Sequence, residues 1–373
     1  MKKLLAVLLL LTAFFGLTPN VNALDVSAGS AVLYCADNGK VYFSKNENKR
    51  VRPASTTKIM TALITLEYAA KNNRNVKFTE DMFSEGSSMY LKKGEVVTLR
   101  DLAVGMLMCS GNDAANAAAI SIAGSKEKFG EIMTDKARKL GMKNTNFVTP
   151  SGLDDDNHYT TAYDMAVLMA AALKNREFKR ITSKKSLTVN FIKPANKITT
   201  YANHNRLLSL YKYCVGGKTG YTDSAGRCLV TAAKKDGLTL IAVTMNDRRD
   251  WVDHTSMYNY GFENYRMREI DDSDYIFDVE TVGGVSDKTA VGGEGYTGIV
   301  LSAEDFSKIK KRVVMDNFLY APVKSGDTLG KIIYTFKGKK IAEHKITAVE
   351  NNNSKIENKS IWENIKGFFN NAF

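Results

Sequence analysis

Ser55 and Lys58 place a hydroxyl and an ammonium three residues apart, just after Pro53, which predicts the start of a helix. On a helix, side chains at positions i and i+3 lie on one face, so the two groups would meet. A serine hydroxyl is a poor nucleophile until a base takes its proton, and a lysine can be that base only where burial or nearby positive charge lowers its pKa. The helix N-terminus would also favour a developing oxyanion. Taken alone, this common spacing favours a capping serine beside an exposed lysine.

Two further motifs follow the first, and each falls where its side chains can reach a cleft. Ser110-Gly111-Asn112 separates two predicted helices, and Lys218-Thr219-Gly220 lies on a predicted strand just before a turn. A chance occurrence of three such motifs in this order and in these local contexts is improbable. Together they match the serine enzymes that recognise penicillin.

The chain is similar to the low-molecular-weight penicillin-binding proteins of the D-alanyl-D-alanine carboxypeptidase family (serine peptidase family S11), and the likeness extends beyond the three motifs. The segment Arg52–Ala62 resembles the nucleophile helix of that family nearly residue by residue. Other similar segments are Thr149–Leu153, His158–Asp164, Gly217–Gly226 and Tyr260–Phe262. The resemblance covers essentially the whole mature chain.

The resemblance implies a role for each motif residue. Ser55 would be acylated by the penultimate D-alanine carbonyl, with Lys58 as general base and Ser110 relaying protons to the leaving amine. The backbone N–H groups of Ser55 and Tyr221 would form the oxyanion hole, although the family often has histidine where Tyr221 stands. The implied substrate-binding residues are Asn112 on the substrate amide, Lys218 as a source of positive potential, Thr219 on the terminal carboxylate, Gly220, Tyr221, and either Arg248 or Arg249, whose guanidinium suits a carboxylate.

The function implied is that of a serine-type D-alanyl-D-alanine carboxypeptidase. It would remove the terminal D-alanine from peptidoglycan pentapeptide stems through a Ser55 acyl-enzyme, would be inhibited covalently by β-lactams, and would act in cell-wall maturation. No cofactor and no metal are expected, because the four histidines show no His-x-x-x-His spacing. These histidines are His158, His204, His254 and His344.

Three alternatives use some of the same features. A D,D-endopeptidase that cuts cross-links would use the same residues. A serine β-lactamase would need a carboxylate to activate the deacylating water, usually in Glu-x-x-Leu-Asn, which the sequence lacks, and class A enzymes usually have Ser-Asp-Asn rather than Ser-Gly-Asn. A non-catalytic wall or membrane adaptor is disfavoured because all the catalytic residues are intact, and labelled penicillin would test it.

The elements that would position these motifs predict an α/β (α+β) domain of the penicillin-binding and serine β-lactamase type, with a mostly antiparallel sheet and helices. A hairpin is predicted around Asn38-Gly39. Helices are predicted at 53–70, 99–109, 113–123, 126–140, 161–173 and 257–265, and later strands at 229–233 and 238–243.

Beyond about residue 268 the helical periodicity disappears, and short apolar runs punctuated by glycine predict a small all-β second domain. Residues 354–373 then form an amphipathic pattern with Trp362, Phe368 and Phe369 on its apolar side. The predicted organisation is a signal peptide at 1–23, the D,D-peptidase domain at 24–268, the β-rich domain at 269–350 and a membrane-associating helix at 351–373.

The two ends of the sequence indicate in which compartment the positive net charge acts. Two lysines and an apolar run, Leu4–Leu17, predict a secretory signal peptide, with an uncleaved anchor as the alternative. An exported protein does not meet nucleic acid, so the formal net charge of +12 indicates anionic surfaces outside the cytoplasm. We expect peripheral attachment to the outer face of the cytoplasmic membrane through the terminal helix, unless its stripe packs on the β domain or a second subunit.

Four cysteines in an exported chain raise the question of disulfides. Cys214 and Cys228 flank a predicted hairpin turn centred near Tyr221, and a register with Tyr221 at the tip would set them opposite each other. The alternative is two isolated buried thiols. Cys35 and Cys109 lie in apolar surroundings and are predicted to be in the core.

Overall fold

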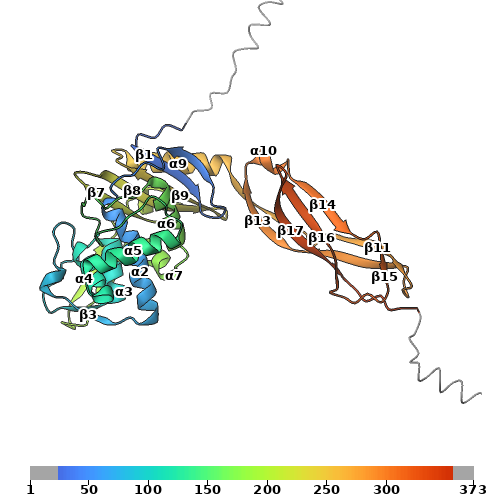
Figure 1. Ribbon diagram of the computed structural model, residues 1–373, viewed down its shortest axis with the longest axis horizontal. Coiled ribbons are helices and arrows are strands. Elements are labelled where there is room, and N and C mark those ends of the chain that lie inside the picture. The colour runs from blue at the N-terminus through green and yellow to red at the C-terminus, as the bar shows by residue number, and fades with distance from the viewer. Residues whose placement is uncertain (1–23, 356–373) are drawn as a thin grey trace, which may run out of the picture. The chain divides into compact units, whose positions relative to one another are not determined.

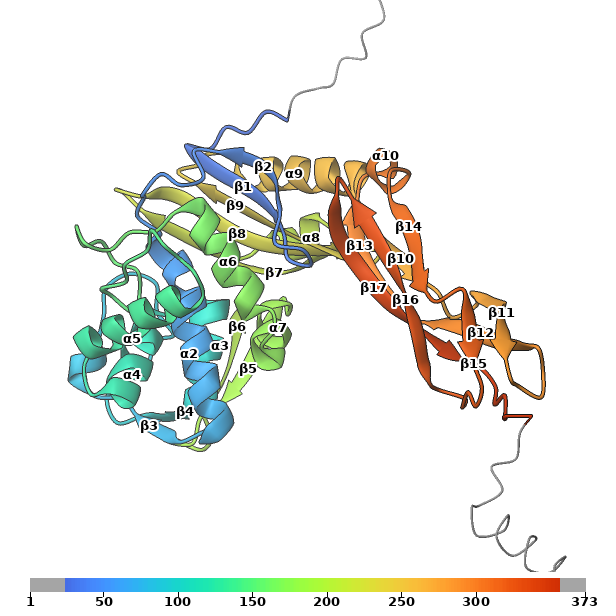
Figure 2. The ribbon, with the colours of Figure 1, turned by 45° about the vertical axis from the view of Figure 1, so that its right-hand side comes forward.

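The computed structural model describes residues 24–355, so the predicted signal peptide and the predicted amphipathic helix from residue 356 onward lie outside the described residues. The chain divides into two compact units, and the second comprises Lys235–Leu238 and the residues from Phe262 (Figures 1 and 2). Within residues 24–355, no helix is both long enough and apolar enough to cross a membrane.

A five-stranded sheet forms the centre of the first unit. Its strands are β1 (Ser30–Cys35), β2 (Val41–Lys45), β7 (Cys214–Thr222), β8 (Gly226–Lys235) and β9 (Leu238–Met245), in the order β2-β1-β9-β8-β7. The β1–β2, β1–β9 and β7–β8 pairs are antiparallel, as predicted. β1 and β9 consist mostly of apolar residues and are buried on both faces of the sheet. β7 is the last strand in the order, so the third motif lies at a sheet edge.

The helices of the first unit are α2 (Lys58–Lys71), α3 (Leu99–Met108), α4 (Asn112–Ala123), α5 (Lys126–Lys139), α6 (Ala162–Ala172), α7 (Arg176–Thr182), α8 (Leu207–Leu210) and α9 (Asp250–Asn264). Figure 2 shows α9 on one side of the sheet and the group containing α2 and α6 on the other. α3 to α6 match their predicted ranges within one residue at each end. α9 starts earlier than predicted. The apolar pattern did not indicate its first turn, because that turn carries the polar residues Asp250 and Asp253.

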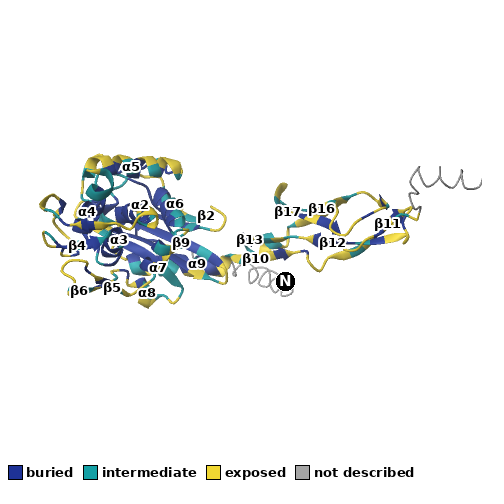
Figure 3. Ribbon diagram, turned by 90° about the horizontal axis from the view of Figure 1, so that it is seen from below, coloured by how far each residue is buried: buried dark blue, intermediate teal, exposed yellow. Residues whose placement is uncertain are grey.

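Two small two-stranded sheets complete the first unit, and sequence patterns did not predict their pairing. One is the β5 (Ser186–Asn190) and β6 (Ile198–Ala202) hairpin, and the other is an antiparallel pair of β3 (Asn75–Lys77) and β4 (Val96–Thr98), whose strands are separated by residues 78–95. Figure 3 shows the buried residues of this unit gathered in α2, α3 and the central strands. The large apolar core therefore surrounds the helix that carries the first motif.

The second unit is built from strands, which confirms the predicted β-rich domain. β10 (Arg266–Asp271) pairs with β13 (Tyr296–Leu301), and a six-stranded sheet has the order β14-β16-β17-β12-β11-β15. The six strands are β11 (Ile276–Val282), β12 (Lys288–Glu294), β14 (Lys310–Met315), β15 (Phe318–Tyr320), β16 (Thr328–Phe336) and β17 (Lys339–Ala348). A short helix, α10 (Ala303–Phe306), links β13 to β14. The unit has a small apolar core of its own.

The predicted register that would place Cys214 opposite Cys228 is wrong. Thr222 pairs with Gly226, so the turn lies at residues 223–225, after Tyr221, and Cys228 faces Gly220 while Cys214 faces Ala233. All four cysteines are free thiols. The error arose because the turn residues are polar and small, and their number cannot be read from the apolar pattern of the strands.

Candidate active site

Ser55 lies in a tight turn that precedes α2. Residues Ala54–Thr57 form a 3-10 turn, and α2 proper begins only at Lys58, later than the predicted start at Pro53. Ala54 has φ = 47°, a left-handed conformation that is costly for a residue with a side chain and that clusters at functional sites. Ser55 is half-buried at the surface of the pocket, whereas Lys58 is completely buried. The turn therefore presents the hydroxyl and hides the amine beneath it.

The Lys58 amine is held by three oxygen atoms. Its Nζ lies 2.9 Å from Ser55 Oγ, 2.6 Å from Asn112 Oδ1 and 2.7 Å from the Ser151 carbonyl oxygen. Burial lowers the pKa of Lys58 well below its usual range, and the positive charge of Lys218 lowers it further. A neutral amine has two N–H bonds and one lone pair. The amide and carbonyl oxygens can only accept, so in the neutral form of Lys58 the lone pair faces Ser55, the one partner with a proton to give.

A buried histidine holds the loop that supplies one of these oxygens. The backbone N–H groups of Val148 and Thr149 donate to His158 Nδ1, at 3.0 and 3.1 Å. His158 Nε2 therefore carries the proton and donates to Thr57 Oγ1 at 2.9 Å. Burial lowers the pKa of His158 to about 4, so the ring stays neutral. His158 thus ties the loop that contains Ser151 to the nucleophile turn.

Ser110 and Lys218 repeat the pairing of a hydroxyl with a buried amine. Lys218 Nζ donates to Ser110 Oγ at 2.9 Å and to the Thr219 carbonyl oxygen at 2.6 Å. Burial lowers the pKa of Lys218 to about 7. Ser110 adopts φ = 59° in the short link between α3 and α4 and is buried. The oxygen atoms that hold Lys58 and Lys218 come from hydroxyl, amide and carbonyl groups, so neither amine is compensated by a directly bonded carboxylate.

Asn112 and Asp113 attach the second motif to the loop at 85–91. Asn112 accepts from Lys58 through Oδ1 and donates through Nδ2 to the Glu85 carbonyl oxygen at 2.6 Å, which leaves Nδ2 a second proton. The Asp113 carboxylate accepts the backbone N–H groups of Met89 and Leu91. This loop therefore forms one wall of the site and contributes Ser87 to the pocket.

Gly220 allows β7 to approach the nucleophile turn. A Cβ atom at this position would lie 3.0 Å from the backbone nitrogen of Ser55 and 2.9 Å from that of Thr56. Tyr221 follows on the strand, and its exposed ring points away from the turn, with its hydroxyl donating to Asp223. The strand thus brings the backbone of Tyr221 beside that of Ser55, and β7 is an edge strand of the sheet, the position at which an extended peptide adds to a sheet.

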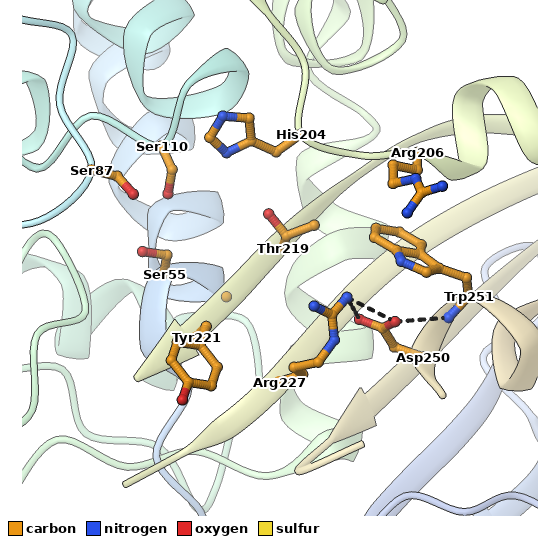
Figure 4. A pocket seen from close by; sticks show the side chains of 11 residues that line it. Ser55, Ser87, Ser110, His204, Arg206, Thr219, Tyr221, Arg227, Asp250 and Trp251 are labelled. Carbon is orange, nitrogen blue, oxygen red and sulfur yellow. Dashed lines mark hydrogen bonds and ion pairs between the residues drawn. The ribbon is translucent and has the colours of Figure 1, made fainter. Parts of the chain in front are cut away.

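These residues surround one pocket of about 400 Å³ (Figure 4). Its lining residues are Ser55, Ser87, Ser110, His204, Arg206, Thr219, Gly220, Tyr221, Arg227, Asp250 and Trp251. In Figure 4 the three serine hydroxyls lie together on one side of Thr219, and Arg227, Asp250 and Trp251 lie beyond it. Lys58 and Lys218 lie behind this lining, bonded to Ser55 and Ser110 respectively, and Asn112 is bonded to Lys58.

The structure does not bring Arg248 or Arg249 to the pocket. Both side chains are exposed after the end of β9 and are not among the lining residues. Arg206 and Arg227 line the pocket instead, and Arg227 forms an ion pair with Asp250 at 2.7 Å. Arg227 lies opposite Tyr221 on β8, so only the number of turn residues separates it from the third motif. Sequence reasoning missed it because that number was misjudged.

The chain matches known proteins in both units. Residues 18–249 match the peptidase S11 family, described as D-alanyl-D-alanine carboxypeptidase, and residues 271–354 match the C-terminal domain of penicillin-binding protein 5. The D-alanyl-D-alanine carboxypeptidase DacF of Bacillus subtilis is 33% identical over 377 residues, which cover 94% of each chain. DacA of Haemophilus influenzae is 32% identical, over 88% of this chain and 85% of its own.

Solved structures give the same result. Penicillin-binding protein 6B from Escherichia coli aligns with a TM-score of 0.67 at 28% identity, covering 88% of this chain and 98% of its own. Penicillin-binding protein 5 from Haemophilus influenzae aligns with a TM-score of 0.66 at 29% identity, over 91% and 100%. The fold and site therefore define a penicillin-binding serine hydrolase. More particularly, the chain belongs to the D-alanyl-D-alanine carboxypeptidase family, and its activity is that of a serine-type carboxypeptidase.

Proposed function

We propose that this protein removes the terminal D-alanine of peptidoglycan stem peptides through an acyl-enzyme on Ser55. The observation that carries the proposal is the 2.9 Å contact between Ser55 Oγ and a buried Lys58 amine whose other two partners only accept hydrogen bonds. As Oγ attacks the penultimate D-alanine carbonyl carbon, Lys58 takes the hydroxyl proton. The N–H groups of Ser55 and Tyr221 hold the oxyanion.

Collapse of this intermediate breaks the peptide bond and releases D-alanine. The leaving nitrogen needs a proton, which Ser110 delivers while Lys218 supplies or replaces it, because an amine with a pKa of about 7 exchanges protons readily near neutral pH. The proton that Lys58 took from Ser55 then replaces the one that Lys218 gave up through Ser110. Water next attacks the Ser55 ester, Lys58 takes a proton from this water, and it returns that proton to Ser55 Oγ as the shortened peptide leaves. Both amines return to their starting protonation states, so the cycle balances.

The substrate would lie along the outer edge of β7, with Asn112 donating the spare Nδ2 proton to its backbone. Thr219 and the cationic end of the pocket would hold the terminal carboxylate. Arg227 fits this task better than Arg248 or Arg249, because Asp250 fixes its guanidinium beside the pocket and Arg206 adds a second positive charge. A site for a free carboxylate favours a carboxypeptidase over a D,D-endopeptidase.

β-Lactams would acylate the same serine and remain bound. Among the lining residues the carboxylate is Asp250, and its ion pair with Arg227 keeps it from activating water at the Ser55 ester. This observation disfavours a β-lactamase, in which a carboxylate must do so. We therefore expect a slow return of activity after β-lactam treatment.

Mass spectrometry tests the proposal directly. Mature protein incubated with a pentapeptide ending in D-Ala-D-Ala should release one D-alanine, and incubation with benzylpenicillin should add its mass to the peptide containing Ser55. Ser55→Ala should do neither, whereas Ser87→Ala, which changes another hydroxyl in the pocket lining, should still be acylated. Acylation of Ser55→Ala, or loss of two residues from the pentapeptide, would overturn the assignment.

We further propose that the mature protein is exported and attached peripherally to the membrane by residues 354–373. Their four aromatic residues and nearly balanced charges indicate binding by apolar burial, so high salt should release the protein only partly. Flotation with liposomes, with and without residues 354–373, tests this. If the mature protein fails to float, or the truncated form floats equally well, attachment by this segment is excluded.

A further inference from the structure

The second unit carries a group of exposed apolar side chains at one sheet edge. Phe318 and Tyr320 on β15 are 46% and 70% exposed, and Val282 on β11 and Val285 in the turn that follows it are 53% and 67% exposed. β15 pairs in parallel with β11, with Tyr320 beside Val282. We call these four residues the tip patch. Its two rings pack edge to face, with centroids 5.3 Å apart.

The core of the unit does not explain the tip patch. Side chains alternate along a strand, and Leu319, between the two aromatic residues, is the one that enters the core. Thr281, next to Val282, likewise points inward and is hydrogen-bonded to Thr289. The exposed aromatic residues therefore stabilise the fold little. Clustered exposed apolar groups of this kind mark contact surfaces.

The course of the chain indicates what the tip patch contacts. The backbone N–H of Lys355, the last described residue, donates to the Gly283 carbonyl oxygen, and the N–H of Val285 donates to the Asn353 carbonyl oxygen. The segment with the amphipathic pattern of Trp362, Phe368 and Phe369 therefore begins between Val282 and Val285. Attachment of the segment from residue 356 onward to the lipid headgroup region, as proposed above, would hold the tip patch at the same surface.

The chemistry of the tip patch fits that surface. Tyrosine and phenylalanine suit the boundary between headgroups and acyl chains, where a ring is apolar on one side and wet on the other. Two ion pairs lie close to it, Lys355 with Asp287 at 2.9 Å and Lys288 with Glu280 at 3.8 Å. The charges of these four residues therefore compensate one another when the patch meets lipid.

We infer that the tip patch is a second lipid contact, which enters the headgroup region beside residues 356–373. The inference rests on the proposed attachment by that segment. Two contacts at one tip hold the second unit in a fixed orientation on the membrane, whereas a single flexible connection does not. The alternatives are that the terminal segment of the same chain, or a second copy of the protein, covers the patch.

The experiment uses the full mature chain and vesicles of phosphatidylethanolamine and phosphatidylglycerol. Tyr320→Cys carries an environment-sensitive fluorophore, and Tyr296→Cys, at a β13 tyrosine that is 61% exposed, is the matched control. Labelled wild type corrects for the native thiols. We expect a blue shift and quenching by brominated lipid for the label at 320 and no change at 296. Flotation is measured on the same samples.

Substitution gives an independent measurement. The double variant Phe318→Ser/Tyr320→Ser should lower the vesicle partition coefficient about tenfold, because two apolar rings no longer enter the interface. Tyr296→Ser should leave it unchanged, and all variants should hydrolyse a soluble peptide normally.

Each result has a distinct meaning. Flotation without a response at 320 overturns the inference and leaves the terminal anchor intact, whereas failure to float refutes the anchor itself. A blue shift at 320 without vesicles also overturns the inference. If that shift depends on protein concentration, a second copy covers the patch, and if it does not, the chain's own terminal segment does.

Discussion

The two units each contain a buried cluster of charged and polar groups, and the clusters differ in how their charges are balanced. In the first unit, Lys58 and Lys218 are buried near each other and are bonded to neutral oxygens. In the second, the buried carboxylate of Asp272 accepts from Lys311 at 2.9 Å and Tyr334 at 2.7 Å and contacts His344 Nδ1 at 2.6 Å. The first cluster holds two amines with no directly bonded carboxylate, and in the second the carboxylate is paired with cationic and hydroxyl partners.

The two clusters also differ in what shifts the pKa values of their buried groups. Burial lowers the pKa of both lysines in the first cluster, and the positive charge of Lys218 lowers the pKa of Lys58 further, so that an amine becomes available as a base. Burial acts to raise the pKa of Asp272, but the hydrogen bonds from Tyr334, Lys311 and His344 outweigh it, and the pKa lies below its usual value. The cluster without opposite-charge partners, the unbalanced cluster, lowers the stability of the fold and supplies a base for catalysis. The cluster whose charges are paired, the balanced cluster, stabilises the fold and supplies no reactive group.

The largest expected effect is that of removing the base from the unbalanced cluster. Lys58→Ala should slow acylation by benzylpenicillin at least about 1,000-fold, because the Ser55 proton has no other acceptor within reach. Lys71→Ala, at the exposed end of the same helix, is the control and should not change the rate. In wild type the rate should rise with pH through an ionisation that Lys58→Ala lacks. Near-normal acylation of Lys58→Ala would refute its role.

The second prediction concerns a substitution that disrupts the balanced cluster. Asp272→Ala leaves Lys311 and His344 without their carboxylate, and it should destabilise the second unit by about 3 kcal/mol. Asp274→Ala, which removes an exposed carboxylate two residues away, should cost little. Hydrogen exchange of peptides from residues 262–355 reports this unit separately. Hydrolysis of a soluble peptide should be unchanged, and loss of that activity would show that the cluster does more than stabilise.

The third prediction compares the two clusters by pH. Lys218 has a pKa of about 7 when folded and about 10.4 when unfolded, so the unfolded chain binds more protons in between and stability rises with pH there, by up to about 1.4 kcal/mol per unit. Asp272 has a lowered pKa, so its contribution is present above about pH 4 and is lost in acid.

Denaturation followed by hydrogen exchange between about pH 7 and pH 8.5 tests this difference. The first unit should gain stability across this range and should gain less in Lys218→Ala, and the second unit should not respond to that substitution. Buried thiols such as Cys109, whose pKa is raised to about 11, oppose the trend only at higher pH. Equal slopes in wild type and Lys218→Ala would mean that Lys218 does not titrate near neutrality.

The fourth prediction concerns the close approach that holds the unbalanced cluster against the substrate strand. Gly220→Ala should push β7 away from the nucleophile turn and slow acylation about 10- to 100-fold, because a shift of about 1 Å misaligns the oxyanion donors. Gly29→Ala is the control, since its Cβ would meet only ordinary contacts at 3.5 Å or more. Normal acylation of Gly220→Ala would show that the strand tolerates the methyl group.

The two clusters also differ in how far the sequence predicts them. Ser55 and Lys58 lie within one helical turn, so their meeting follows from local geometry, and the family resemblance supplied their partners. Lys311 and His344 come from separate strands, Asp272 follows the end of β10, and no motif contains them, so only the completed sheet pairing brings them together. Arg227 was not predicted for the same reason, because its position opposite Tyr221 depends on the length of one turn. The helices α3 to α6, in contrast, could be predicted from apolar periodicity alone.

The smallest effect is expected at the edge of the unbalanced cluster, where Arg227 is partly exposed and already paired with Asp250. If Arg227 holds the terminal carboxylate, Arg227→Gln should raise KM for a D-Ala-D-Ala peptide about tenfold and leave kcat nearly unchanged. A peptide that ends in a carboxamide should bind both forms equally weakly. Arg249→Gln, which removes an exposed guanidinium outside the pocket, should behave as wild type. An unchanged preference for the free carboxylate in Arg227→Gln would assign that recognition to Arg206 and Thr219 alone.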